Sequence, residues 1–377
     1  MSGGPHPTVL ICGYYGFGNI GDEAVLAGIL QQLSSLWPKA RYLVLSADPE
    51  RTAREHGVEA VRRYDVKSVC RAMRTSTVLI SGGGTLLQDV TSSRSLYYYL
   101  LMILAARWYR LPVIIYGQGI GPLRSSWNRF LTSRVLRLSQ LIIVRDMGAY
   151  EQLAAWGIDE KKLCLGADPV LALKVTAIDD HQEQLQGKLR RHQPVLFVSL
   201  RPWPLLNASL PTLAATLDRL CEKAWQVVFI PFQFDADYPV CRACAALMRK
   251  PALVWDKPLA VKEALALFGE ADYCLGMRLH SLIFAAVQEV PMLGIAYDPK
   301  VEEFLRQLGL EELAIPLPNA TGQPLDGELL TRYLELLEKE GDRLTAQARE
   351  KLEEMAVRLG RATQHIGELM RGSSMLY

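Results

Sequence analysis

The 377-residue sequence lacks any apolar run long enough to cross a bilayer, because a membrane-spanning helix needs roughly 20 consecutive apolar residues. Its most apolar stretch, residues 96–108, is shorter and is interrupted by Arg107. This stretch predicts a buried helix, and the alternative is a helix that contacts a membrane surface. No signal peptide is expected, since the short polar segment at residues 1–7 leads at once into a strand-like run.

The chain also lacks a charge excess and a cysteine framework. Its 42 Lys and Arg against 40 Asp and Glu give a formal net charge of +2, so no nucleic-acid partner is expected. The seven cysteines are odd in number and lie mostly in apolar segments, which is typical of the reducing cytoplasm. Cys241 and Cys244 form a Cys-x-x-Cys pair, but nothing completes a zinc site around them, so two thiols on a helix are expected.

What the sequence does contain is an alternation of short apolar runs with longer helical patterns, without a short-period repeat. This alternation predicts parallel α/β sheets, and the length predicts two domains. The predicted strands are residues 9–12, 42–45, 78–80, 113–116, 141–144, 163–165, 195–200, 227–230, 253–255, 273–275 and 292–296. The predicted helices are residues 23–36, 95–109, 127–138, 210–224, 261–268 and 282–287.

The expected division has four parts: an N-terminal α/β domain at 1–173, a polar linker at 174–194, a C-terminal α/β domain at 195–325 and a leucine-rich helical segment at 326–377. Two Rossmann-like α/β domains joined by a linker leave a cleft between them, and ligands prefer such places. Within each open parallel sheet, ligands bind beyond the carboxyl ends of the strands. Candidate functional residues are therefore expected at those ends.

Glycine-rich segments follow three apolar runs in the first half, at residues 13–23, 82–84 and 117–122. Glycines after strands let backbone amides approach a ligand, and helix N-termini there favour anions. The third segment includes Gln118, which is a candidate binding residue. The string Gly16-Phe-Gly18-Asn-Ile-Gly21 matches a dinucleotide fingerprint, but it lies several residues past the strand and lacks a suitable acidic residue after the next strand. NAD binding is therefore not expected.

Gly82, Gly83 and Gly84 are more glycines than a turn needs, so close approach of their backbone to a ligand is expected. Arg94 lies ten residues further on, either near the same site or simply on the surface.

Asn19, Asp22 and Glu23 lie where a loop enters a helix. Asp22 either caps that helix or acts as a carboxylate that accepts protons from a sugar hydroxyl.

Arginines follow apolar runs at three further points. Arg145 and Arg201 come directly after predicted strands, where a planar guanidinium suits a carboxylate or phosphate. A structural ion pair is the alternative for each. Arg278 and His280 follow a strand-like run in the second half, and a helix is expected to begin right after His280. An anion held by Arg278 would also interact with the amino end of that helix, so a functional site is favoured over a structural histidine.

Seven motifs in this order resemble the polysaccharide pyruvyl transferase family, most closely its CsaB type. They are Gly18-Asn-Ile-Gly-Asp-Glu23, Gly82-Gly-Gly-Thr-Leu-Leu-Gln-Asp89, Gly117-Gln-Gly-Ile-Gly-Pro122, Val144-Arg-Asp146, Ala167-Asp-Pro169, Met277-Arg-Leu-His280 and Tyr297-Asp-Pro-Lys300. The resemblance implies a fold similar to GT-B glycosyltransferases. It also implies transfer of pyruvate from phosphoenolpyruvate, a co-substrate rather than a cofactor, onto a sugar as a cyclic ketal.

For the CsaB type, the implied acceptor is N-acetylmannosamine on a lipid-linked cell-wall polymer precursor, and the ketal bridges O4 and O6 and helps to anchor surface-layer proteins. The resemblance places Arg278, Leu279 and His280 at the phosphoenolpyruvate site in the C-terminal domain, with the acceptor on the N-terminal side. It also implies a second arginine, and the sequence leaves Arg145 and Arg201 as open alternatives.

The hypothetical mechanism uses His280 as general acid and Asp22 or Glu23 as base. No metal is required, because arginines can screen the phosphate. A cytoplasmic enzyme with a peripheral contact at the inner face of the plasma membrane would fit a lipid-linked acceptor. The oligomeric state is not predicted. Two other functions are weighed: a GT-B glycosyltransferase that uses a nucleotide sugar, and a non-catalytic anion- or sugar-binding module.

Overall fold

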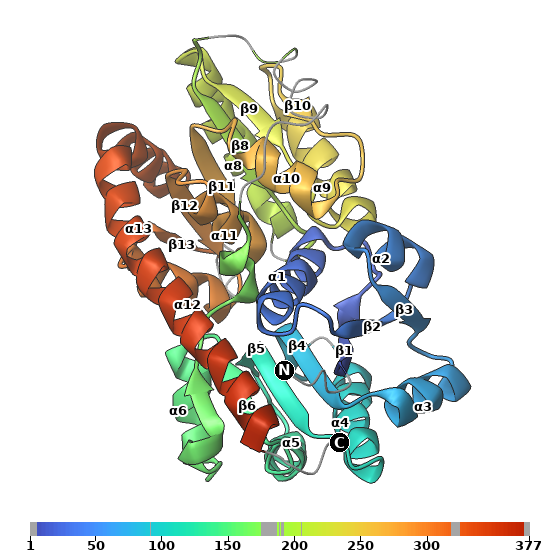
Figure 1. Ribbon diagram of the computed structural model, residues 1–377. Helices are drawn as coiled ribbons and strands as arrows, with labels where there is room; N and C mark the ends of the chain where they lie inside the picture. Colours follow the sequence, from blue (N-terminus) through green and yellow to red (C-terminus); the bar gives the residue numbers. More distant parts are fainter. Residues whose placement is uncertain are drawn as a thin grey trace. The chain divides into compact units, whose positions relative to one another are not determined.

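The computed structural model describes residues 6–90, 92–174, 187, 189, 192–204, 206–317 and 325–372. These residues form two compact units (Figure 1). The first takes the described residues up to Phe17, then Asp22–Leu173 and those from Met355 onwards. The second takes Gly18–Gly21 and the described residues between Lys174 and Glu354. Most of the predicted linker at 174–194 lies outside the described residues.

The first unit contains a parallel sheet whose described strands have the order β3-β2-β1-β4-β5-β6-β7. The strands are β1 (Thr8–Tyr15), β2 (Arg41–Ser46), β3 (Glu59–Arg62), β4 (Val78–Leu87), β5 (Val113–Ile120), β6 (Leu141–Val144) and β7 (Leu163–Leu165). The helices are α1 (Ile20–Leu36), α2 (Pro49–His56), α3 (Val66–Thr75), α4 (Ser93–Trp108), α5 (Ser126–Leu136) and α6 (Met147–Ala155), with 3₁₀ turns at Glu160–Lys162 and Pro169–Ala172.

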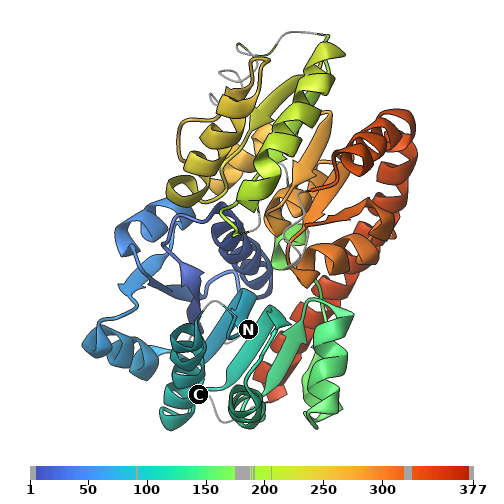
Figure 2. The same cartoon turned by 180° about the vertical axis from the view of Figure 1, so that it is seen from behind.

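The second unit contains a parallel sheet with the described order β10-β9-β8-β11-β12-β13. Its strands are β8 (Val195–Ser199), β9 (Gln226–Phe229), β10 (Leu253–Val254), β11 (Tyr273–Gly276), β12 (Met292–Ala296) and β13 (Ala314–Pro316). Its helices are α8 (Leu206–Glu222), α9 (Phe234–Leu247), α10 (Val261–Phe268), α11 (Leu279–Val287) and α12 (Pro299–Gln307), with a 3₁₀ turn at Glu311–Leu313 and the first part of α13 (Gly327–Gly372). Figure 2 shows these elements from behind.

Helices cover both faces of the first sheet, as its continuous apolar strands require. Leu10 and Cys12 of β1 pack in one core with residues of α3, α4, α5 and α6. Ile11 is also fully buried, and it points to the opposite face because side chains alternate along a strand. After β1 the chain continues to β2 on one side of the sheet centre, and after β4 it continues to β5 on the other side. Because both crossovers are right-handed, α1 lies on the face opposite to α4.

The last helix, α13, is shared between the units. Within the second unit, its Gln347 side chain donates to the carbonyl of Gly309 at 2.6 Å. Within the first unit, Thr363 shares a 2.6 Å hydrogen bond with Tyr116 of β5. The predicted division kept residues 326–377 as a separate segment and Gly18–Gly21 in the first domain. The contacts instead divide α13 at Met355 and place Gly18–Gly21 with the second unit.

The predicted α/β class with two parallel sheets is confirmed. Several bounds differ from the prediction. Gly82, Gly83 and Gly84 lie inside β4, not after it, because backbone pairing continues past the apolar run: Gly82 pairs with Tyr116 and Gly84 with Gln118. The helix α11 begins at Leu279, so His280 lies in its first turn and does not precede it. Within the described residues, no helix has the length and hydrophobicity needed to cross a bilayer.

Candidate functional site

The strand order of each sheet reverses at one point, between β1 and β4 in the first unit and between β8 and β11 in the second. Ligands of open parallel sheets bind beyond the carboxyl ends of strands at such points. Gly84 lies near the carboxyl end of β4, Arg201 follows β8 and Arg278 follows β11. The structure therefore places these three predicted residues at the reversal points of their own sheets, whereas Arg145 follows β6 and Gln118 lies in β5.

Arg278 is held by side chains of the β9–α9 segment in the second unit. Its Nε donates to Oδ2 of Asp237 at 3.0 Å, and its Nη2 donates to Oδ1 of Asp237 at 2.6 Å and to Oε1 of Gln233 at 3.3 Å. Asp237 is fully buried and also accepts hydrogen bonds from the backbone amides of Phe232 and Gln233. This two-point pair fixes the plane of the guanidinium, while 11% of the Arg278 side chain stays exposed.

His280 packs against the short segment Gly18–Gly21, which belongs to the same unit. A Cβ atom on Gly21 would lie only 2.2 Å from Nδ1 of His280, so the imidazole covers the bare backbone at this glycine. Asn19 forms the turn by accepting a hydrogen bond from the Gly21 amide at 3.0 Å, and the Ile20 amide donates to the carbonyl of Phe232 at 2.9 Å. Asn19 therefore shapes the backbone beside His280.

Arg201 lies in an aromatic setting in the second unit. Its Nη1 donates to the Tyr297 hydroxyl at 2.7 Å, and its guanidinium carbon lies 4.8 Å from the Tyr297 ring centre and 5.5 Å from that of Trp203. Among the described residues, no carboxylate forms an ion pair with Arg201, and its buried Nε has no hydrogen-bond partner. Within the described part of the chain, the Arg201 charge therefore contacts aromatic rings and one hydroxyl and no carboxylate.

Sequence reasoning did not single out Tyr297 or Trp203. A signal was present, since Tyr297 follows strand β12 and begins the Tyr297-Asp-Pro-Lys300 motif. Lys300 adds a second cation to this group: its Nζ lies 5.4 Å from the Tyr297 ring centre and 3.4 Å from Asp298.

Arg145, in the first unit, differs in its charge balance. It is buried, and its Nη1 and Nε lie 3.4 Å from carboxylate oxygens of Asp168 and Asp146. Its Nη2 donates to the Thr85 hydroxyl at 3.0 Å. The structural ion pair that the sequence left open is thus present, and two carboxylates already neutralise Arg145.

The two adjacent carboxylates of α1 have different surroundings. Glu23 is buried, with Oε1 accepting from the Gly16 amide at 2.7 Å and Oε2 lying 3.1 Å from Nε2 of His56. This carboxylate therefore holds the turn at Gly16, whose φ of +79° requires glycine. Glu55 joins Glu23 and His56 in a cluster whose potential metal-ligand atoms lie within 4.8 Å of one another. Both oxygens of Glu23 are already engaged in this cluster.

Asp22 is only half-buried and faces strand β4. A Cβ atom on Gly84 would lie 3.3 Å from Oδ1 of Asp22. The other two glycines of this motif have a packing role: Cβ atoms on Gly82 and Gly83 would lie 2.4 Å and 1.7 Å from side-chain atoms of α1. Gly84 is thus the one of the three that faces the Asp22 carboxylate.

Three further polar residues of the first unit have different surroundings: Gln118, Arg94 and Arg63. Gln118 is fully buried, and its Nε2 ties β5 to β4 by donating to the carbonyl and hydroxyl oxygens of Ser81, both at 2.9 Å. Arg94 is exposed in the first turn of α4. Arg63, which sequence reasoning missed, donates to the Gly13 carbonyl at 2.9 Å and lies within 4.4–5.6 Å of four aromatic ring centres.

Tyr15 also lies beneath this edge, and its hydroxyl donates to the carbonyl of Gly82 at 3.0 Å. Burial raises the pKa of the Tyr15 phenol well above its ordinary value, and the nearby Cys12 and Asp22 raise it further. Tyr15 therefore stays protonated at neutral pH and acts as a hydrogen-bond donor, not as a base.

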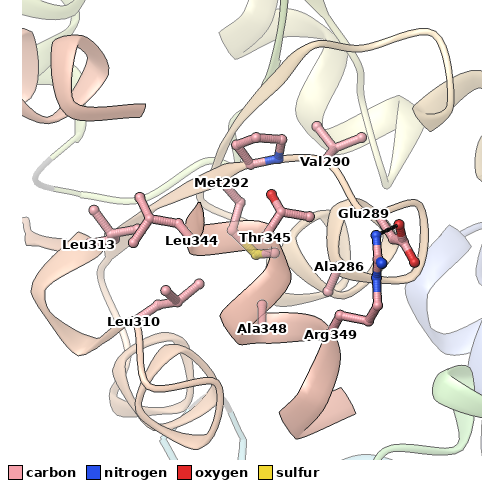
Figure 3. A pocket seen from close by; sticks show the side chains of 11 residues that line it. Ala286, Glu289, Val290, Met292, Leu310, Leu313, Leu344, Thr345, Ala348 and Arg349 are labelled. Carbon is pink, nitrogen blue, oxygen red and sulfur yellow. Dashed lines mark hydrogen bonds and ion pairs between the residues drawn. The ribbon is translucent and has the colours of Figure 1, made fainter. Parts of the chain in front are cut away.

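A hollow of about 290 Å³, partly open to solvent, lies elsewhere in the second unit (Figure 3). It is at the amino end of β12, whereas Tyr297 and Arg278 follow the carboxyl ends of their strands. Its charged lining residues, Glu289 and Arg349, form an ion pair with each other (Figure 3). It is lined by Ala286, Glu289, Val290, Pro291, Met292, Leu310, Leu313, Leu344, Thr345, Ala348 and Arg349. An apolar hollow at this edge does not suit a small, doubly charged anion.

Comparisons with known proteins agree with this fold and sequence pattern. The family model described as polysaccharide pyruvyl transferase matches residues 19–299. Among solved structures, the S. aureus MnaA–UDP co-structure has a TM-score of 0.66 at 11% identity and covers 98% of both chains. The Neisseria meningitidis UDP-GlcNAc 2-epimerase bound to UDP-GlcNAc has a TM-score of 0.65 at 12% sequence identity, and the match covers 97% of this chain and 100% of that one. A glycosyltransferase from Rickettsia africae has a TM-score of 0.65 at 10% sequence identity, and the match covers 98% of this chain and 100% of that one. At these identities the likeness shows a GT-B-like fold alone.

Proposed function

Because the chain belongs to the polysaccharide pyruvyl transferase family, we propose that it transfers pyruvate from phosphoenolpyruvate to a sugar as a 4,6-linked ketal and releases phosphate. The acceptor that we propose is N-acetylmannosamine of a lipid-linked cell-wall polymer precursor, as in the CsaB type, with the enzyme in the cytoplasm. The reaction needs no metal or organic cofactor, since arginine side chains can screen the phosphate charge.

The observation that carries the proposal is the difference in charge balance among the arginines. Arg145 is neutralised by two carboxylates, whereas Arg201 forms no ion pair with a described residue. Arg278 is oriented by Asp237 and lies directly before α11. Phosphoenolpyruvate carries a carboxylate and a phosphate, and each charge-assisted hydrogen bond contributes about 1.5–3 kcal/mol. We therefore assign Arg201, in preference to Arg145, as the second phosphoenolpyruvate arginine.

Ketal formation needs one proton delivered to carbon and two removed from oxygen. Protonation of the methylene carbon of phosphoenolpyruvate makes C2 electrophilic, and one sugar hydroxyl adds there and loses its proton. The C2–O bond to phosphate then breaks, and phosphate leaves with the bonding electron pair. The second hydroxyl attacks C2 and loses its proton, which closes the ring. The sugar thus loses two protons, of which one ends in the new methyl group and one on phosphate.

In this scheme His280 is the general acid, because it lies in the first turn of α11 beside Arg278. Leu279, between them, is buried and fixes this turn in the core. Asp22 is the base that we favour for the hydroxyls, since its carboxylate is half-buried and faces the glycine backbone of β4. Glu23 is bonded at both oxygens, so we assign it to holding the loop that precedes α1.

The decisive experiment measures phosphate release from phosphoenolpyruvate across a panel of amino-sugar acceptors, with mass spectrometry of the product. We expect acceptor-dependent release and a product heavier by one ketal-linked pyruvate. The same panel with UDP-sugars tests a nucleotide-sugar glycosyltransferase, because two proteins with this fold were solved with UDP and with UDP-GlcNAc. Glycosyl transfer without phosphate release from phosphoenolpyruvate would contradict the proposal, and binding without turnover of either donor would favour a non-catalytic module.

A further inference from the structure

Helix α4 is apolar on its outer face as well as on its inner face. Its inner side chains, such as Leu100 and Ile103, are buried in the core of the first unit. Its outer side chains are spaced one helical turn apart and are exposed by 42%, 57%, 42% and 85%: Tyr97, Leu101, Leu104 and Trp108. We call these four residues the α4 stripe. A surface helix of a globular protein normally turns polar residues outward, so the stripe is unexplained by the fold.

The neighbouring helix α5 extends this surface. The two helices are in contact and lie side by side (Figure 1, Figure 2). The Tyr97 hydroxyl donates to the Asn128 side chain at 2.9 Å. Trp127 and Phe130 of α5 are exposed by 63% and 52%, and their rings stack with centres 5.7 Å apart. Six large apolar side chains are therefore exposed on two adjacent helices.

The charge around these helices has one sign. Residues 90–144 contain no Asp, Glu or Lys, although the chain as a whole carries 40 acidic residues. The same stretch contains seven arginines, of which all but Arg107 are exposed: Arg94, Arg107, Arg110, Arg124, Arg129, Arg134 and Arg137. Among the described residues, none of the seven forms an ion pair with a carboxylate. The acidic residue just before the stretch, Asp89, accepts hydrogen bonds from the backbone amides of Arg124 and Ser125 at the start of α5.

We propose that the outer faces of α4 and α5 form a docking surface for an anionic lipid bilayer. Exposed Trp and Phe side chains enter the interface between headgroups and acyl chains, and arginines are attracted to anionic headgroups. A second copy of this chain is a poorer occupant. In a symmetric pair the same arginine-rich surface would face itself without acidic partners, and like charges would oppose association.

The position of this surface fits a membrane-bound acceptor. Trp127 lies in the first turn of α5 and Arg94 in the first turn of α4, so both are near the carboxyl edge of the first sheet. A lipid-linked sugar could thus reach the edge that carries Asp22 and Gly84 while its lipid stays in the bilayer. This link rests on the proposed function, whereas the docking surface itself does not.

The test is co-sedimentation of the full chain with vesicles rich in phosphatidylglycerol and with vesicles of phosphatidylcholine alone. Two variants remove one property each: Arg129→Glu with Arg134→Glu reverses charge, and Leu101→Ser with Trp108→Ser removes apolar side chains. The matched control changes the same residue types on the exposed side of α9, Arg242→Glu with Leu247→Ser. All six positions are exposed, so folding should persist in every variant.

We expect wild-type and control proteins to bind the anionic vesicles, less tightly at high salt, and each surface variant to bind at least about tenfold more weakly. Equal binding to neutral vesicles, or an equal loss in the control, would overturn the proposal. The proposal would also be overturned if the wild-type protein bound no vesicles but formed a dimer, and the surface variants were monomers. Phosphate release with a soluble acceptor should be unchanged in the surface variants. Arg201→Met should release phosphate more slowly yet bind vesicles as the wild type does, which separates failure of this inference from failure of the proposed function.

Discussion

Arg278 and Asp237 are 41 positions apart in the sequence, yet the guanidinium donates to both carboxylate oxygens, at 3.0 and 2.6 Å. The carboxylate is inaccessible to solvent and also receives two backbone amides at the start of α9. Under the proposed function, Asp237 is a positioning residue, because it sets the direction of Arg278 without touching the substrate.

Asp237→Asn should therefore impair both folding and phosphoenolpyruvate binding. Removing one partner of a buried ion pair leaves an uncompensated charge, so we expect a loss of about 3 kcal/mol in unfolding free energy. In the fraction that folds, KM for phosphoenolpyruvate should rise. Urea unfolding and steady-state kinetics measure the two effects. Asp235→Asn, on the exposed side of the same helix, is the control and should change neither.

Gly21→Ala tests the packing of His280 on bare backbone. A new Cβ 2.2 Å from Nδ1 must displace the imidazole, although the backbone φ at Gly21 is not left-handed. Because small displacements of a catalytic group cost about 100-fold in rate, kcat for phosphate release should fall by about that factor while the thermal midpoint is maintained. Gly360→Ala, a helical glycine with open space around it, is the matched control. An active Gly21→Ala enzyme would argue against His280 as the acid.

The two candidate arginines should respond differently to removal of their charge. Arg201→Met should lower kcat/KM for phosphoenolpyruvate by about 10- to 100-fold, as expected for one lost charge-assisted hydrogen bond. Arg145→Met should mainly destabilise the first unit, because Asp146 and Asp168 lose their shared cation. Parallel kinetics and denaturation of both variants decide the assignment. The reverse pattern would give the ligand role to Arg145.

Conservative substitutions should distinguish the roles of the two neighbouring carboxylates of α1, Asp22 and Glu23. Asp22→Asn should reduce phosphate release by about 100-fold or more if Asp22 is the general base. Glu23→Gln keeps an oxygen that can accept from the Gly16 amide, so we expect activity to be retained with a stability loss of about 1–3 kcal/mol. Loss of activity in Glu23→Gln without loss of stability would reverse these roles.

Stability should fall at alkaline pH because of buried thiols. Burial raises the pKa of Cys241 to about 12 and that of Cys244 to about 12, against an ordinary thiol value of 9.0, with Asp237 and Asp218 adding to the respective shifts. Because the pKa values are higher in the folded state, the two thiols contribute their full stabilisation of the fold below pH 9.0. This stabilisation is lost between pH 9.0 and about 12, because the thiols of the unfolded chain ionise first.

Urea unfolding at about pH 8 and at about pH 10 measures this loss, which is about 1.4 kcal/mol per pH unit for each thiol. Replacing both thiols by alanine should reduce the slope without abolishing it, since burial also raises the pKa of the Cys12 and Cys274 thiols and of tyrosines such as Tyr15. Val240→Ala, a neighbouring buried position, should lower stability without changing the slope. An unchanged slope in the double variant would contradict the prediction.

The predictable part of the fold and site followed from local patterns. Apolar runs and helical periods were enough to anticipate parallel α/β sheets, and α10 was predicted with the bounds that the structure has. Helix α9 was missed, because it begins with acidic residues and contains Pro239. Asp237, in its first turn, accepts hydrogen bonds from the Phe232 and Gln233 amides and from Arg278, which lies 41 positions away and reaches it only in the folded chain. Strand β3 was missed because it is a short edge strand with charged ends.

The sequence by itself determined which chemical groups stand at the ends of the strands, since strand ends and motifs are local properties of the chain. Tertiary structure decided what each group can do there. It neutralised Arg145 with Asp168, left Arg201 among aromatic rings, bonded Glu23 at both oxygens and laid His280 against Gly21. The physical reason is that charge balance and burial depend on partners far away in sequence, which come together only when the sheets form.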